Sequence, residues 1–120
     1  MTIQERNQLT NELLDGVFQT GSSKGAAYAQ EGDCLSNFKD VAAMLGLTKY
    51  QVWAVYAEKH FIAITNAIRN NPEHPVERTE SMRGRIIDGI VYLTILHAML
   101  EEDAATDAES LPAHPAEVQR

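Results

Sequence analysis

Two long stretches of helical hydrophobic periodicity dominate this sequence, and they limit the chain to a helical fold. The first covers residues 49–70 and the second covers residues 80–102, so each exceeds twenty residues. The segment between them, 71–79, contains two prolines and is predicted to be a connecting loop. Helices of that length extend for roughly 30 Å, and the short loop predicts that they pack antiparallel as a hairpin.

Two shorter helices are predicted ahead of the hairpin, over residues 3–19 and 35–45, with Gly46 as a left-handed C-cap. The segment 20–33 between them is rich in Gly and Ser and is predicted to be a loop. Capping boxes with a three-residue spacing mark two helix starts: Thr2 with Glu5, and Thr48 with Gln51. The whole pattern predicts an all-α fold, a four-helix bundle-like domain over residues 1–102.

The acidic character of the chain is concentrated at its C-terminal end. The net charge is −7, but residues 101–120 hold six acids and one base, so residues 1–100 are nearly neutral. Residues 103–120 have few large apolar side chains to offset their ordering entropy and are predicted to be a disordered tail. Duplex DNA is therefore not expected as a partner, whereas a small anion needs only a local group of donors.

The second long helix is apolar around most of its circumference, and such a helix needs partners on more than one side. The sequence therefore predicts a homodimer or a higher homo-oligomer with the two long helices at the interface. The most apolar segment, 86–100, is interrupted by Asp88, Thr94 and His97. It is predicted to be a buried helix and not a membrane span.

Cysteine usage and the N-terminal residues bear on the compartment. Cys34 is the single cysteine, so it forms no internal disulfide. The first residues lack a basic segment followed by an apolar block, and no signal peptide is expected. Both features favour a reducing cytoplasm.

Two charged residues contradict their apolar surroundings. Lys59 is spaced at helical intervals from apolar residues, and Asp88 is the only charge between Ile86 and Leu100. Burial of a charge costs several kcal/mol, about 3–5, unless the charge is paired or bound. Lys59 and Asp88 are predicted either to pair across the hairpin or to line a wet pocket that holds a ligand. Gly84 and Gly89 allow close helix packing or leave room for that ligand.

Basic side chains gather near the start of the second long helix. Arg78, Arg83 and Arg85 lie there, and the first loop is expected to bring Lys24 and Lys39 near. A helix N-terminus adds N–H donors suited to phosphate. The alternative interpretation is a solvated charged face.

Metal ligands are few. The carboxylate pairs Glu77–Glu80 and Glu12–Asp15 come from segments whose meeting the sequence does not establish, and the four histidines lack zinc spacing. No metal or cofactor is predicted.

Several short motifs carry a family resemblance. Lys24 leads through Tyr28-Ala and an acidic stretch to Asn37-Phe38, Glu58-Lys59 follows, and Glu80-Ser81 precedes Asp88 and Tyr92. Over residues 20–102 this order resembles small helical bacteriophage proteins described as nucleotide-modification-associated. Those proteins are similar to the MazG-type all-α nucleotide pyrophosphohydrolases, so the resemblance implies a nucleotide ligand and an infected bacterial host cell.

The departures from that pattern favour binding over hydrolysis. The family commonly has an acidic pair where this chain has Arg83 and Gly84, and Arg85 stands where an ExxD motif would place its first acid. Replacing carboxylates with arginine converts a cation site toward an anion site. The resemblance then implies sequestration of a nucleotide signal, or assistance in nucleotide modification, without strong catalysis.

The resulting hypothesis assigns the ligand contacts to aromatic, basic and polar side chains from all parts of the domain. These are Lys24, Tyr28, Asn37, Phe38, Lys39, Lys59, Glu80, Arg83, Arg85, Asp88 and Tyr92. One alternative is a Mg²⁺-dependent nucleotide pyrophosphohydrolase that uses Glu58, Glu77, Glu80 and Asp88. The other is a protein–protein interaction module, in which the surface of the two long helices binds a partner. Tyr28 and Phe38 are also open to the plainer interpretation that each is a core residue.

Overall fold

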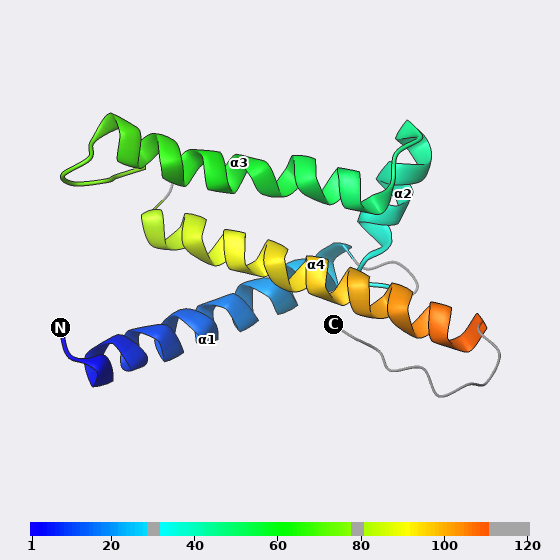
Figure 1. Ribbon diagram of the computed structural model, residues 1–120, viewed down its shortest axis with the longest axis horizontal. Coiled ribbons are helices and arrows are strands. Elements are labelled where there is room, and N and C mark those ends of the chain that lie inside the picture. Colours follow the sequence, from blue (N-terminus) through cyan, green and yellow to red (C-terminus); the bar gives the residue numbers. More distant parts are fainter. Residues whose placement is uncertain (29–31, 78–80, 111–120) are drawn as a thin grey trace.

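The computed structural model describes residues 1–28, 32–77 and 81–110, without the side chains of residues 26–28 and of residue 110. It contains four helices, α1 (Ile3–Tyr28), α2 (Ser36–Leu45), α3 (Lys49–Asn70) and α4 (Met82–Ser110) (Figure 1). The described residues form no β-strand. The predicted all-α fold class is therefore confirmed.

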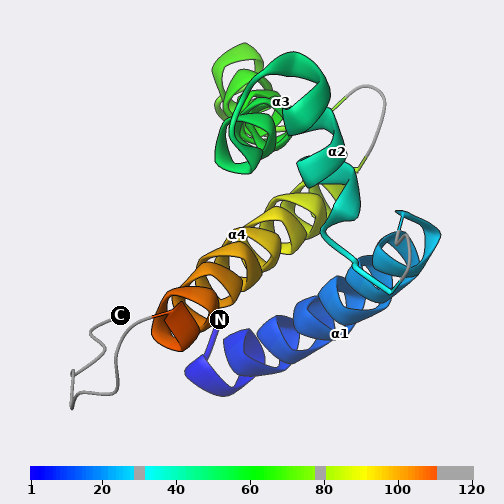
Figure 2. The same ribbon diagram turned by 90° about the vertical axis from the view of Figure 1, so that its right-hand side faces the viewer.

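Helix α4 lies in the centre of the molecule. Figures 1 and 2 show α3 antiparallel to α4 on one side, α1 crossing α4 on another, and α2 set against the start of α3. The predicted hairpin of the two long helices is confirmed. The bundle is open, with extents of 55 × 38 × 26 Å and a radius of gyration of 17.7 Å. A compact domain of this length has a radius of gyration of about 14 Å.

Local sequence signals account for several helix ends. Thr2 and Glu5 exchange the two hydrogen bonds of a capping box at the start of α1, and Thr48 and Gln51 do the same at α3. Gly46 ends α2 in the left-handed conformation with φ 67°. The predicted range of the first long helix, 49–70, agrees with α3.

Helix α1 continues to Tyr28, so the loop predicted over 20–33 is wrong for its first nine residues. The glycines of this segment lie on a helix that packs against α4. A Cβ at Gly21 would lie 3.8 Å from the Val91 side chain, which is ordinary contact distance. Lys24 adds an ion pair to Asp88 of α4. Tertiary contact with α4 thus outweighs the low helix propensity of these residues.

Helix α4 also runs farther than predicted, to Ser110, so the disordered tail assigned to 103–120 is wrong for 103–110. Lys49 Nζ donates to Asp103 at 2.5 Å and the Tyr50 hydroxyl donates to the same carboxylate. The hydrogen bonds from Lys49 and Tyr50 lower the pKa of Asp103. Burial, followed by the bond to Asp103, raises the pKa of Tyr50 to about 12. Residues 111–120 lie outside the described part of the chain.

Two small apolar clusters hold the helices together. The larger joins α2, α3 and α4 and consists of Leu35, Phe38, Ala42, Val52 and Met99. The smaller joins α1 to α4 through Val17, Ile87 and Val91. Among the described residues, no helix has the length and apolar content that crossing a membrane requires.

Substitution of Met99 tests the dependence of the fold on the larger cluster. Met99 is fully buried, so Met99→Ala should lower the free energy of unfolding by about 2–5 kcal/mol, measured by urea denaturation. Met44 on α2 is 75% exposed, and Met44→Ala should change the free energy of unfolding by less than about 0.5 kcal/mol. Equal effects of the two substitutions would contradict the packing described.

Candidate functional site

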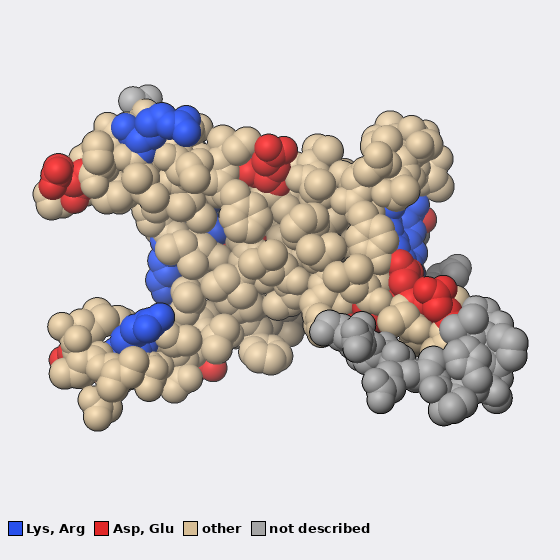
Figure 3. Space-filling view, viewed as in Figure 1, with Lys and Arg blue, Asp and Glu red and all other residues tan. Residues whose placement is uncertain are grey.

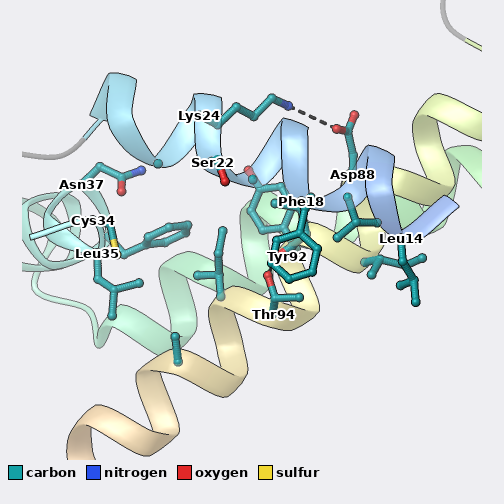
Figure 4. Close-up of a pocket in the computed structure, with 18 residues that line it drawn as sticks. Leu14, Phe18, Ser22, Lys24, Cys34, Leu35, Asn37, Asp88, Tyr92 and Thr94 are labelled. Carbon is teal, nitrogen blue, oxygen red and sulfur yellow. Dashed lines mark hydrogen bonds and ion pairs between the residues drawn. The ribbon is translucent and has the colours of Figure 1, made fainter. Parts of the chain in front are cut away.

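A groove of about 610 Å³ lies between α1, α4 and the segment that enters α2. This volume is within the range of small-molecule sites. Its walls are mainly apolar and aromatic: Leu14, Val17, Phe18, Leu35, Phe38, Ile90, Val91, Tyr92, Ile95 and Ala98 (Figure 4). The polar lining residues are Ser22, Lys24, Cys34, Asn37, Asp88 and Thr94.

Three glycines on α1 explain how the groove opens. A Cβ at Gly16 would lie 2.9 Å from the Ile87 side chain, one at Gly21 would lie 3.8 Å from Val91, and one at Gly25 would meet nothing within 4 Å. The space beside α1 therefore widens from its middle toward its C-terminal end. Gly21 and Gly25 line the groove, so the missing side chains leave it open.

An ion pair closes one edge of the groove. Lys24 Nζ of α1 lies 3.2 Å from Asp88 Oδ1 of α4 (Figure 4). The Asp88 side chain is only 14% exposed, whereas that of Lys24 is 52% exposed. The carboxylate is therefore held in the wall, while the ammonium group reaches solvent, where an anion can approach it.

Behind Asp88 lies a buried histidine. His60 of α3 is 5% exposed, its Nδ1 lies 3.7 Å from Asp88 Oδ2, and its ring packs on Tyr92 at 5.2 Å. Burial lowers the pKa of His60, although the nearby Asp88 charge opposes that effect. Arg85 Nη1 donates to His60 Nδ1 at 3.2 Å. The neutral imidazole therefore carries its proton on Nε2.

The aromatic wall is organised around Phe38. This ring is 3% exposed and packs edge-on against Tyr92, with centroids 6.4 Å apart and an interplanar angle of 88°. Trp53 Nε1 of α3 donates to the Tyr92 carbonyl at 2.6 Å, which ties this part of α4 to α3. Phe18 of α1 also lines the groove, and it is 76% exposed.

The structure brings part of the predicted site together. Five of the eleven residues line the groove, namely Lys24, Asn37, Phe38, Asp88 and Tyr92. They come from α1, α2 and α4, which are far apart in the sequence.

Four predicted residues lie elsewhere. Lys39 bridges Asp33 and Glu102, both at 2.8 Å, and these carboxylates raise its pKa. Lys59 is exposed on α3, so its predicted position on a buried face and its predicted pairing with Asp88 are wrong. Asp88 pairs with Lys24 instead, and on its α3 side the carboxylate faces His60, which points toward α4 while the adjacent Lys59 is exposed to solvent.

The two arginines at the start of α4 also lie outside the groove. Arg83 is exposed and donates to the Glu12 carbonyl of α1 at 3.5 Å. The Arg85 side chain is 14% exposed and lies 3.7 Å from Glu77. Arg83 and Arg85 therefore contact other parts of the fold instead of joining Lys24. The side chain of Tyr28, and residues Arg78 and Glu80, lie outside the described part.

The carboxylates of the hydrolase alternative do not converge where the structure describes them. Glu58 is exposed on α3, Glu77 lies beside Arg85, and Asp88 is paired with Lys24. Within residues 1–28, 32–77 and 81–110, no three His, Cys, Asp or Glu side chains are placed to share a metal ion. Gly84 and Gly89 are not lining residues of the groove, and Gly89 receives the Phe61 ring, 3.4 Å from where a Cβ would be. Close helix packing is therefore the role of Gly89.

Sequence reasoning missed several groove residues: Phe18, Ser22, Gly25, Cys34, Thr94 and the supporting His60. Gly21 and Gly25 are four residues apart, a spacing that puts both on one helix face. That signal is informative only once α1 is known to reach Tyr28.

Comparisons with protein-family models, curated proteins and solved structures found no match for this chain. The assignment of the site therefore depends on its geometry and on the sequence resemblance described above.

The buried histidine predicts acid sensitivity. Because the folded state lowers the pKa of His60, the unfolded state binds its proton first as the pH falls below about 6.5. The free energy of unfolding therefore has its full value above that pH and decreases toward pH 5. The decrease caused by His60 is at most about 1.4 kcal/mol per pH unit. Denaturation curves between pH 7 and 5 measure the slope. His60→Gln should flatten it, whereas His74→Gln in the exposed loop should not. An unchanged slope in His60→Gln would exclude this residue as the cause.

Proposed function

We propose that this protein binds a nucleotide or nucleotide-derived ligand in the groove between α1 and α4. The observation that carries the proposal is the Lys24–Asp88 pair at the edge of an aromatic groove. In the complex, the base lies against Phe18 and Tyr92, since aromatic surfaces stack with bases. Phe38, which is 3% exposed, supports Tyr92 from within the fold. Lys24 turns from Asp88 to a phosphate group, and Asp88 then accepts a hydrogen bond from the sugar or the base.

Binding without strong catalysis is the form of the proposal that the contacts support. Asp88 is already engaged by Lys24, so a divalent cation would have to displace the lysine before it reached this carboxylate. Recognition by Lys24 and aromatic surfaces needs no metal.

The wider setting follows the resemblance to the phage proteins and is part of the same proposal. The protein acts in the cytoplasm of an infected bacterial cell, as a homo-oligomer, where it sequesters a nucleotide signal or assists nucleotide modification.

Isothermal titration calorimetry with nucleoside mono- and triphosphates and with cyclic dinucleotides tests the proposal. Gly25→Leu is the most direct variant, because a Cβ at this position meets nothing within 4 Å and the added side chain enters the groove. It should reduce affinity at least tenfold, which is about 1.4 kcal/mol, and leave the helical circular dichroism unchanged. Gly25→Ala adds only one methyl group and is the matched control; it should keep most of the affinity.

The polar pair gives a second test. Lys24→Met should weaken binding at least tenfold because the phosphate loses its cationic partner. Lys59→Met removes an exposed lysine outside the groove and should bind as the unmodified protein does. No heat or thermal shift with any of these ligands would refute the binding proposal. Release of pyrophosphate with Mg²⁺, lost in Asp88→Asn, would replace it with the hydrolase alternative.

A further inference from the structure

Two rows of exposed apolar residues follow the seam between α3 and α4. Ile86, Leu93 and Leu100 are seven residues apart on α4, and Phe61 and Ile68 are seven apart on α3. These five residues, called here the apolar stripe, are between 38% and 53% exposed. Seven residues are nearly two helical turns, so each row lies along one side of its helix. The Phe61 ring rests on Gly89 of α4, which joins the two rows into one surface.

The apolar stripe lies on the opposite side of α4 from the groove. Val91 lines the groove and Leu93 belongs to the stripe, and a two-residue step turns a helix by about 200°. None of the five stripe residues lines the groove. The stripe and the groove are therefore formed by different residues.

Charge is sparse on this surface. Residues 89–100 of α4 contain no Asp, Glu, Lys or Arg. In Figure 3 one acidic patch lies over the middle of α3, and most other charged side chains gather toward the edges of the molecule. A strongly acidic or basic partner would find few complementary charges along the stripe itself, whereas an equally apolar surface would fit.

We infer that the apolar stripe is the contact surface for a second copy of this chain, which packs its own α3 and α4 across it as a two-fold symmetric four-helix bundle. The inference specifies the partner and the surface of the homo-oligomer proposed above and is independent of the ligand. Seven-residue spacing is the repeat by which helices pack side by side at small crossing angles, so the spacing selects a helical partner. A second copy supplies the same two rows, as a two-fold interface requires.

The dimensions of the molecule agree with a missing partner. Helices α3 and α4 together offer a face of about 30 Å by 20 Å, or about 600 Å², which is of the same order as the roughly 800 Å² that each subunit contributes to a stable dimer.

Sedimentation equilibrium of the full chain tests the inference. The unmodified protein should sediment at twice its 13.3 kDa mass at micromolar concentration. Leu93→Glu places a charge in the centre of the stripe and should raise the dimer dissociation constant at least a hundredfold. Met44→Glu on α2 is the matched control, because Met44 is 75% exposed and belongs to neither the stripe nor the groove. It should leave the mass unchanged.

Leu100→Glu, at a 53% exposed position, is a second variant in case Leu93→Glu loses its helical circular dichroism. A monomeric unmodified protein, or a dimer that survives both stripe substitutions, would overturn the inference. Nucleotide titrations separate it from the proposed function. Gly25→Leu should lose ligand binding and remain dimeric. Absence of ligand binding would therefore not contradict the dimer, and absence of the dimer would not contradict ligand binding.

Discussion

The packing of α1 and α3 onto the central α4 is the constraint on which the rest of the structure depends. The contact with α1 is close at Gly16, and the contact with α3 is close at Gly89, where the Phe61 ring occupies the space of a side chain. Because α1 touches α4 tightly at one point and diverges from it toward Gly25, a groove opens between them. The same crossing of α1 and α4 thus forms part of the apolar core at its close end and the candidate site at its open end.

Ion pairs and hydrogen bonds support the last turns of two of the helices. Lys24 binds Asp88 in the last part of α1, and Lys49 with Tyr50 binds Asp103 in the last part of α4. Neither segment is a strong helix former by its sequence alone, since the last part of α1 contains glycines and the last part of α4 has few large apolar residues. Exposed ion pairs contribute little singly, about 0–1 kcal/mol, but each of these acts beside a packed helix face and needs to stabilise only a few residues.

The candidate site was accessible to sequence reasoning only in part. Asp88 was identifiable because a carboxylate in an apolar helix requires a partner, and the lysine and aromatic residues of the first half of the chain were reasonable candidates. The partner of Asp88 was not identifiable from the sequence. Lys59 and His60 are adjacent, and the rotation of about 100° between neighbouring helical residues lets His60 point inward while Lys59 points to solvent. Arg83 and Arg85 looked like a phosphate site by charge alone, but in the fold Arg83 reaches α1 and Arg85 reaches Glu77.

The sequence by itself determined the helical class, the antiparallel pairing of the two long helices and three helix ends, because periodicity, capping boxes and Gly46 act through contacts of a few residues. The tertiary structure alone decided the length of α1 and α4, the partner of Asp88 and the existence of the groove. Those features depend on which faces of distant helices meet, and on how closely glycine lets them approach. The energies involved come from packing and charge pairing between residues tens of positions apart, and no local pattern encodes them.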